Sequence, residues 1–343
     1  MTAKRRELAT SGKPGRRFAF VKPPPYFLGH PYWKWLVDDL AARLDAALDG
    51  AYRVERELGG GAASRLFVAV EPALDRRVVI KVLSPDSTSE VSAARFKREI
   101  ALAAHLQHPH ILPLLSAGSQ QDLLYYVMPY LEGESLRHRL QRDGRLPIEA
   151  AVTILREVAD ALAVAHAAGF VHRDVKPGNI LLQGSHAVLT DFGVARALLE
   201  ARGGRRLTDP GTAVGTPGYM SPEQAVGDAE VDARSDVYAL AIVGYEMLAG
   251  APPFTGPTLR AVIVAHLAQV PKPLREVRGD VPGAVADAIA KALAKDPADR
   301  FQTAAAFRDA LPPPVEPVPH GRRAGLRALT AGLAALAGWR RRG

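Results

Sequence analysis

The residues best suited to chemistry lie in one short stretch, residues 171–182, which read VHRDVKPGNILL. Its polar members are Arg173, Asp174, Lys176 and Asn179. An acid, two cations and a carboxamide between two apolar runs make a poor core, but they are typical of a rigid loop that presents polar groups to a reactant. A second acid, Asp191, is followed by Phe and Gly and comes just after another apolar run.

A glycine-rich segment lies where a strand is expected to turn back, and residues 58–66 read LGGGAASRL. Such a turn leaves backbone N–H groups free to approach an anion, although the same pattern is also typical of a plain tight turn. Lys81 ends the apolar run at residues 78–80, and Glu99 can supply the acidic partner that a buried ammonium needs. Taken alone, each of these two charges is better explained as a solvated surface residue.

The order of these motifs resembles that of the protein kinases: a glycine-rich loop, a strand lysine, a helix glutamate, an H-R-D-x-K-P-x-N loop and a D-F-G triplet. Residues 215–223, GTPGYMSPE, stand where that family has A-P-E, and the resemblance covers residues 52–311. The details are similar to serine/threonine kinases of the bacterial, eukaryotic-like type, and Lys176 favours Ser/Thr over Tyr specificity. The resemblance implies an enzyme that transfers the γ-phosphoryl group of ATP to Ser/Thr hydroxyls of protein substrates.

The resemblance also implies roles, which follow from the positioning and charge neutralisation that phosphoryl transfer needs. Asp174 orients the substrate hydroxyl and accepts its proton. Lys176 stabilises charge on the transferred phosphoryl group. Asn179 and Asp191 hold Mg²⁺, or Mn²⁺, through the hard oxygen donors that such ions prefer.

The same resemblance predicts the ATP-binding residues. Lys81, fixed by Glu99, binds the α- and β-phosphates. The adenine is enclosed by three apolar side chains, Leu66, Val79 and Leu181. Met128 guards the deeper pocket. The set is completed by the loop residues Leu58, Gly59, Gly60, Gly61, Ala62, Ala63 and Ser64, and by Tyr130 and Leu131, whose segment offers backbone hydrogen bonds to the adenine edge.

Some residues are expected to support the site. Glu223 and Arg300 resemble the structural ion pair of the family's large lobe, Asp236 resembles the carboxylate that anchors the catalytic loop, and His172 is interpreted as structural. Ser64 and Pro129 depart from the commonest residues at their positions, but neither departure touches a catalytic residue.

The elements that must position these residues can be predicted from hydrophobic periodicity. Alternating residues predict two or three antiparallel strands over residues 52–82, and the apolar run 123–128 predicts a buried strand. Helical spacing is present at residues 36–48, 90–106, 148–168, 222–226, 235–250, 258–268, 282–294 and 303–311. We therefore expect an α+β protein with the two-lobed kinase fold.

The domain boundaries expected from these elements divide the chain into three parts. An N-terminal extension over residues 1–50 ends in an amphipathic helix. The kinase domain over 52–311 has a β-rich N-lobe, 52–131, and a helical C-lobe, 132–311. A Pro-rich linker and a basic amphipathic tail fill residues 312–343.

Composition narrows the class of protein. The chain has 343 residues, 48% hydrophobic and 23% charged, which excludes a disordered or fibrous protein, and its lack of cysteine excludes disulfides and thiolate chemistry. The chain has 44 Lys/Arg and 36 Asp/Glu residues. The two end segments, 1–50 and 312–343, together hold 15 of the basic and 6 of the acidic residues, which leaves 29 basic and 30 acidic residues in between. Because the net charge of +8 lies in the tails, no nucleic-acid partner is expected.

The tail at residues 312–343 has two interpretations, a solvated tail or a basic amphipathic segment on an anionic membrane surface. No secretory signal is seen at the start of the chain. The expected location is cytoplasmic, with peripheral attachment to the inner face of the membrane as the alternative.

Two other functions compete with an active protein kinase. A pseudokinase scaffold would lack Lys81, Asp174 or Asp191, and all three are present. A small-molecule phosphotransferase of related fold generally lacks the activation segment and the S-P-E and Arg300 pair. Both features are present here, which argues against that class.

An activation switch is predicted from the segment between Asp191 and Glu223. In the family, an arginine before the catalytic aspartate, here Arg173, couples activity to a phosphate on this segment. Thr208 and Thr212 are the phosphorylation candidates, whereas Thr216 is given a structural role. We therefore expect autophosphorylation in trans, through a transient homodimer.

Overall fold

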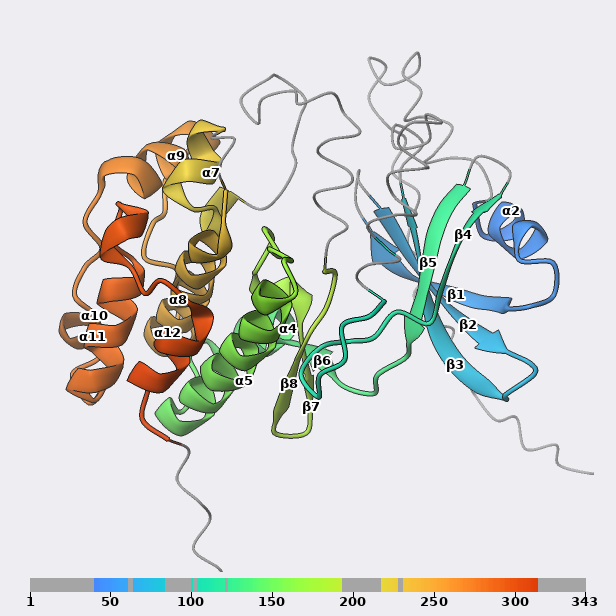
Figure 1. Cartoon of the computed structure of the whole chain (residues 1–343), viewed down its shortest axis with the longest axis horizontal. Helices are drawn as coiled ribbons and strands as arrows, with labels where there is room; N and C mark the ends of the chain where they lie inside the picture. The colour runs from blue at the N-terminus through green and yellow to red at the C-terminus, as the bar shows by residue number, and fades with distance from the viewer. Residues whose placement is uncertain are drawn as a thin grey trace, which may run out of the picture.

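The structure is a computed structural model of the chain, and it describes residues 40–60, 64–83, 100, 104–120, 123–192, 217–227 and 231–313. A small lobe rich in strands and a larger helical lobe lie side by side (Figure 1). This arrangement matches the α+β, two-lobed architecture expected from the sequence.

The small lobe is built on a five-stranded antiparallel sheet in the order β1-β2-β3-β5-β4. Its strands are β1 (Arg53–Gly60), β2 (Ser64–Glu71), β3 (Arg76–Leu83), β4 (Ser116–Gln120) and β5 (Leu123–Pro129). Three strands therefore occupy the region where two or three were predicted, and the apolar run 123–128 is the buried strand β5. Strand β4 was not predicted, because its sequence SAGSQ is mostly exposed and has no apolar alternation.

The two faces of this sheet are covered differently. On the outer face, α2 (Leu40–Ala47) packs Leu40 and Leu44 against the strands, and both side chains are at most 1% exposed. Full burial of one such leucine contributes about 1.5–3 kcal/mol. The N-terminal part of the helix predicted over residues 36–48 lies outside the described residues.

The inner face of the sheet turns toward the large lobe and carries a second apolar group, which we call the inner-face cluster. Its buried members are Val79, Leu83, Ile100, Leu112, Leu124, Tyr126, Met128 and Val188, with Leu66, Leu114, Tyr130, Leu131 and Leu181 partly buried against them. Val188 and Leu181 come from the large lobe, so this cluster joins the two lobes.

The helix predicted over residues 90–106 is shorter at its C-terminal end than expected. Ile100 is helical, but residues 104–105 form a turn and Leu106 is not helical. The other residues of that prediction lie outside the described part.

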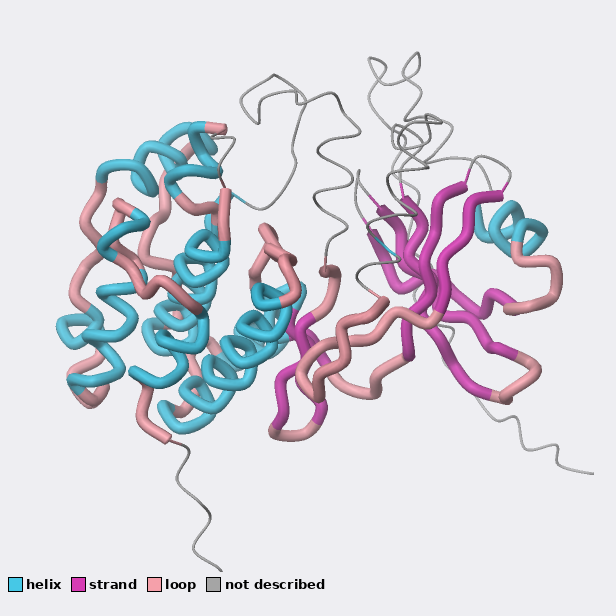
Figure 2. The backbone as a smooth tube through the Cα atoms, viewed as in Figure 1, coloured by secondary structure: helices cyan, strands magenta, loops and turns pink. Residues whose placement is uncertain are grey.

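The large lobe contains the remaining helices (Figure 2). They are α4 (Leu136–Asp143), α5 (Ile148–Ala167), α7 (Pro222–Val226), α8 (Ala233–Ala249), α9 (Leu259–Ala268), α10 (Leu274–Val277), α11 (Gly283–Ala292) and α12 (Ala304–Ala310), with short 3₁₀ turns at Pro177–Asn179, Pro217–Tyr219 and Pro297–Asp299. Six of these helices match the predicted segments to within about two residues at each end, as expected for helix boundaries. Helices α4 and α10 were missed because they are mostly polar and bury few apolar side chains, namely Leu136 and Leu140 in α4 and Leu274 in α10.

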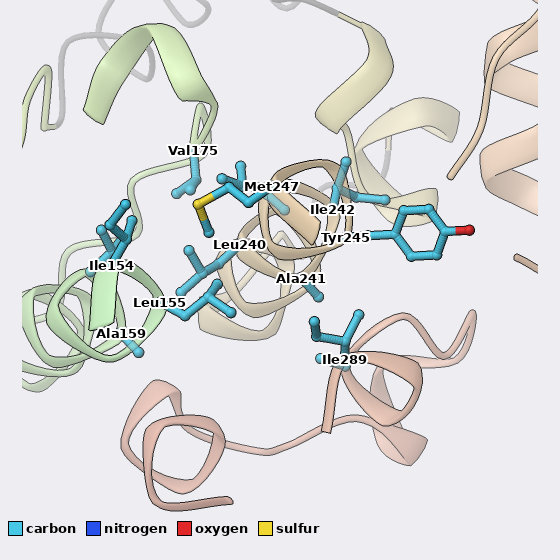
Figure 3. Packing of buried hydrophobic residues seen from close by; sticks show 14 of the residues in the cluster. Ile154, Leu155, Ala159, Val175, Leu240, Ala241, Ile242, Tyr245, Met247 and Ile289 are labelled. Carbon is cyan, nitrogen blue, oxygen red and sulfur yellow. The ribbon is translucent and has the colours of Figure 1, made fainter. Parts of the chain in front are cut away.

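Helix α8 is the centre of the large lobe, because almost every residue along it is buried. Leu240 lies beside Leu155 of α5, and Ala241 lies on the side of Ile289 of α11 (Figure 3). Gly244 allows the close approach, since a Cβ there would lie 3.0 Å from the Leu155 methyl groups. This rigid centre supports the loop described next.

A second, three-stranded sheet lies at the junction of the lobes, in the order β6-β7-β8. Its strands are β6 (Glu134–Ser135), β7 (Ile180–Gln183) and β8 (His186–Leu189). A bridge between Ile111 and Leu189 ties the segment before β4 to the end of β8. Both ends of the predicted catalytic region, at Asn179 and Asp191, are therefore held next to this sheet.

Among the described residues, no helix combines the length and the apolar character that crossing a membrane requires.

Candidate active site

The predicted catalytic loop brings its polar side chains together. The ammonium of Lys176 lies 2.7 Å from Oδ2 of Asp174, and the Asn179 amide donates to the same oxygen at 3.0 Å and to the Asp174 carbonyl at 2.8 Å. Asn179 is buried, whereas the side chains of Lys176 and Asp174 are 21% and 27% exposed. Asp174 is thus oriented by two fixed donors and still reaches solvent.

A buried carboxylate beneath the loop holds its backbone. Asp236, in the first turn of α8, accepts the N–H groups of His172 and Arg173, each at 2.7 Å. Arg173 has φ of 65°, a left-handed conformation that costs a non-glycine residue about 1–2 kcal/mol. The two hydrogen bonds to Asp236 stabilise this turn, as predicted for an anchor of the loop.

His172 links the catalytic loop to the segment that carries Asp191. Its Nε2 lies 2.8 Å from the carbonyl of Thr190, and its Nδ1 accepts the N–H of Asp174 at 3.2 Å. Because a carbonyl only accepts, this network assigns the proton to Nε2. The ring also packs edge-on against Phe192 at 4.7 Å, which supports the structural role predicted for it.

Asp191 faces the small lobe and forms an ion pair across the two lobes. Its Oδ2 lies 2.7 Å from Nζ of Lys81 on β3, and its Oδ1 accepts the hydroxyl of Tyr126 on β5 at 2.7 Å. Burial alone would raise the pKa of Asp191, but the charge of Lys81 and the hydrogen bonds from Lys81 and Tyr126 hold it below its usual value. Asp191 is therefore ionised. Glu99, the predicted partner of Lys81, lies outside the described residues.

The glycine-rich loop is the connection of the β1–β2 hairpin. Gly59 pairs with Leu66 and Gly60 with Arg65. A Cβ on Gly60 would lie 2.5 Å from the Ser64 carbonyl oxygen, so only glycine fits at this close approach. Leu58 is exposed at this end of the hairpin, while Gly61, Ala62 and Ala63 lie outside the described residues.

The predicted adenine-site residues come together on the inner face of the small lobe. Val79 and Met128 are buried members of the inner-face cluster, and the partly buried members from these predictions are Leu66, Tyr130, Leu131 and Leu181. The Tyr130 N–H is directed to the Arg77 carbonyl at a long 3.4 Å. The two lobes thus contribute one apolar surface next to Lys81 and Asp191.

Glu223 and Arg300 form the predicted ion pair deep in the large lobe. The guanidinium binds both carboxylate oxygens, at 2.8 and 2.9 Å, and also donates to the carbonyls of Ala294 and Lys295. Burial tends to raise the pKa of Glu223, but hydrogen bonds from Arg300 and Ser235 outweigh it and lower the pKa. The pair is a fixed part of the scaffold.

Besides the pairing of Lys81 with Asp191, two further contacts at the site were not predicted. Tyr126 reaches Asp191, and Gln224 of α7 donates to the carbonyl of Arg173 at 2.8 Å. In the structure Tyr126 shares the inner face of the sheet with Leu124 and Met128, and its contact across the lobes had no signal in the sequence. Thr208 and Thr212 lie outside the described residues.

Comparisons with known proteins agree with this geometry. The protein kinase domain family matches residues 52–311. The serine/threonine-protein kinase PknA of Mycobacterium tuberculosis is 37% identical over 301 residues, which cover 83% of this chain and 68% of PknA. PknD of the same organism is 43% identical over 269 residues, and PknB of Mycolicibacterium smegmatis is 40% identical over 267; each match covers 76% of this chain but only 40% and 42% of those relatives.

A solved structure shows the same fold. The crystal structure of a point mutant of the Mycobacterium tuberculosis PknI kinase domain matches with a TM-score of 0.60 and 32% identity, covering 76% of this chain and 94% of that domain. The chain therefore belongs to the protein kinase family and is a serine/threonine protein kinase of the bacterial, eukaryotic-like type.

Proposed function

We propose that this kinase transfers the γ-phosphoryl group of ATP to Ser/Thr hydroxyls of protein substrates, with Asp174 and Lys176 as its catalytic residues. The observation that carries the proposal is that the structure forms two groups of interacting polar residues. Asp174, Lys176 and Asn179 share one hydrogen-bonded network, and Lys81 of the small lobe meets Asp191 of the large lobe next to the apolar adenine-site surface.

Asp174 is the group that would receive the substrate hydroxyl. Its Oδ2 is engaged by Lys176 and Asn179, and these donors orient the carboxylate. The carboxylate would accept the proton as the hydroxyl oxygen bonds to the γ-phosphorus and the bond from that phosphorus to the β-phosphate oxygen breaks, which releases ADP. Lys176, whose Nζ lies 2.7 Å from Oδ2 of Asp174, would stabilise the negative charge on the transferred group.

The residues present fit a divalent cation. The Asn179 amide nitrogen donates to Asp174, which turns the carbonyl oxygen of the same group away from that residue, and the lowered pKa of Asp191 keeps its carboxylate ionised. Two hard oxygen donors are what Mg²⁺ or Mn²⁺ would need from the protein. When bound, the cation would neutralise charge on the ATP phosphates, and Lys81 would turn from Asp191 to the α- and β-phosphates.

The direct test replaces Asp174 by asparagine. With radiolabelled ATP, Mg²⁺ and a generic basic protein, Asp174→Asn should lower phosphoryl transfer by about 10²–10⁴-fold, with an unchanged unfolding midpoint. Asp280→Asn is the matched control, because Asp280 lies on the surface in a pair with Arg278. Near-normal transfer by Asp174→Asn, with contaminating kinase excluded, would show that the role assignment is wrong.

We further propose activation by autophosphorylation in trans, at Thr208, Thr212 or both. The support is the position of Arg173, whose N–H is held by Asp236 and whose carbonyl accepts Gln224 just after the activation segment. Mass spectrometry of wild-type protein beside Asp174→Asn identifies the sites. A Thr208→Ala/Thr212→Ala variant should be less active on an added substrate; equal activity would reject activation by phosphate.

The domain organisation that we propose keeps a kinase domain at residues 52–311, divided after residue 131, between an extension at 1–50 and a tail at 312–343. The proposed location is cytoplasmic. Attachment of the basic tail to anionic membrane remains a separate proposal, supported by Leu326, Leu329, Leu333, Leu336 and Trp339 among arginines. Co-sedimentation with anionic vesicles, for the full chain and a variant ending at Leu311, decides it; equal binding contradicts attachment.

A further inference from the structure

The hydroxyl of Tyr126 donates a hydrogen bond to Asp191, and the proposed function gives this tyrosine no role. The two oxygen atoms are 2.7 Å apart, and Tyr126 is fully buried. Asp191 is a proposed metal ligand, so the contact joins a residue of the small-lobe sheet to the group that would hold the cation. A buried phenol hydroxyl needs a hydrogen-bond partner, and here that partner is Asp191.

The register of the small-lobe sheet explains how the contact arises. Lys81 on β3 is directly opposite Tyr126 on β5, and the lysine Nζ lies 5.9 Å from the centre of the tyrosine ring. The two side chains therefore extend from the same face toward Asp191. Lys81 reaches Oδ2 and Tyr126 reaches Oδ1, so each carboxylate oxygen has its own donor.

These two donors differ in what they can do when nucleotide binds. Lys81 is long and flexible, its side chain is 13% exposed, and the proposed function requires it to turn to the phosphates. Tyr126 is held by the inner-face cluster, with Leu112, Leu124 and Met128 among its members, and has little freedom to move. The tyrosine is therefore the donor that can stay on Asp191 throughout the reaction.

We propose that Tyr126 is a positioning residue, whose hydroxyl holds Oδ1 of Asp191 so that Oδ2 faces the divalent cation once Lys81 has left. The inference rests on the proposed function, and it assigns Tyr126 a part in metal affinity without contact to the metal. Residues that orient metal ligands in this way commonly affect metal affinity or activity about 10–100-fold.

The hydroxyl is suited to a lasting donor role. A tyrosine hydroxyl ordinarily loses its proton only at about pH 10, so it remains a donor at neutral pH. The geometry of Asp191 needs such support, because its φ of 69° lies in the left-handed region that favours glycine.

The test removes only the hydroxyl, in the full-length chain. Tyr126→Phe is compared with Tyr125→Phe, which removes the hydroxyl from the preceding residue of β5. The side chain of Tyr125 lies on the opposite face of the sheet, in the buried cluster that includes residues of α2. Calorimetry measures the affinity for a non-hydrolysable ATP analogue, once with Mg²⁺ and once with EDTA. We expect Tyr126→Phe to weaken binding with Mg²⁺ by about 10-fold and to leave binding in EDTA unchanged, while Tyr125→Phe matches the wild type in both.

A merely structural role predicts a different pattern. It would lower the unfolding midpoint and weaken nucleotide binding equally with and without Mg²⁺, and that result would overturn the proposal. An unchanged or stronger Mg²⁺ dependence in Tyr126→Phe would overturn it as well. If the phenylalanine variant folds poorly, Tyr126→4-aminophenylalanine keeps a donor at the same place, and recovery of Mg²⁺-dependent binding supports the proposal while its failure contradicts it. Failure of the proposed function would instead appear as wild-type protein that binds no nucleotide.

Discussion

Two acid–base pairs in this kinase have similar distances and very different surroundings. In the large lobe, Arg300 binds both oxygens of Glu223, and its side chain is fully buried. Between the lobes, Lys81 binds one oxygen of Asp191, and the two side chains are 13% and 17% exposed. Both carboxylates have a lowered pKa, although burial alone would raise it.

The difference lies in how many alternatives each cation has. The guanidinium of Arg300 also donates to the carbonyls of Ala294, Lys295 and Arg234, so its fork of donors is used in one fixed geometry. Lys81 is a point charge on a flexible stem, and it can turn to another anion without leaving a buried group unpaired, provided that Asp191 gains a cation. The first pair stabilises the fold, and the second is suited to exchange partners during catalysis.

The largest expected effect comes from breaking the exchanging pair, Lys81 and Asp191. Asp191→Asn removes a carboxylate that would hold the cation, so phosphoryl transfer should fall by about 10³-fold or more, while the unfolding midpoint in urea stays close to wild type. Lys81→Met should also lose most activity and leave the large lobe intact. A large loss of stability in either variant would mean that this pair, too, is part of the scaffold.

The next largest effect is expected from breaking the fixed pair, Glu223 and Arg300. Arg300→Ala leaves Glu223 buried without its partner, so the free energy of unfolding should fall by about 3–5 kcal/mol, measured by urea denaturation. Arg234→Ala is the control, because its pair with Asp232 is partly exposed and should contribute at most about 1 kcal/mol. Equal losses in the two variants would contradict the distinction between the pairs.

The smallest expected effect is a pH dependence of the free energy of unfolding, and it arises near the fixed pair. His266 is fully buried, with Nδ1 3.1 Å from the hydroxyl of Tyr238, whose ring stacks under Arg300. Burial, and then the charge of Lys295, lower the pKa of His266 to about 4. Because the folded protein disfavours the charged ring, its contribution to stability is complete above the unfolded pKa of about 6.5. That contribution is lost as the pH falls toward 4.

The measurement is the free energy of unfolding at several values between pH 7 and pH 4.5. Wild type should lose stability over this window, and His266→Phe should show a shallower slope. His138→Gln, a change on the exposed side of α4, should keep the wild-type slope. An identical slope in His266→Phe and wild type would rule out His266 as the source.

Sequence could predict the parts of the site that are local in the chain. Asp174, Lys176 and Asn179 lie within six residues of one another, so one loop brings them together whatever the details of packing. The strands and long helices could be predicted from periodicity, because periodicity is also a local property of the chain. Helices α4 and α10 and strand β4 are mostly polar, so few apolar residues mark them in the sequence.

Contacts between distant residues were beyond prediction from periodicity. Tyr126 and Asp191 are 65 residues apart, and their hydrogen bond depends on the β3–β5 register and on the approach of the lobes. The pairing of Lys81 with Asp191 was not foreseen either, because the resemblance pointed to Glu99. The register that places Lys81 opposite Tyr126 could only come from the folded sheet.

The measurement closest to the central claim is a crystal structure of the full chain with Mg²⁺ and a non-hydrolysable ATP analogue. We predict that Lys81 Nζ leaves Asp191 for a phosphate oxygen and that Asp191 binds the cation, while Arg300 keeps both hydrogen bonds to Glu223. A nucleotide complex in which Lys81 still binds Asp191, or in which the Glu223–Arg300 pair has separated, would contradict the division between an exchanging pair and a fixed one.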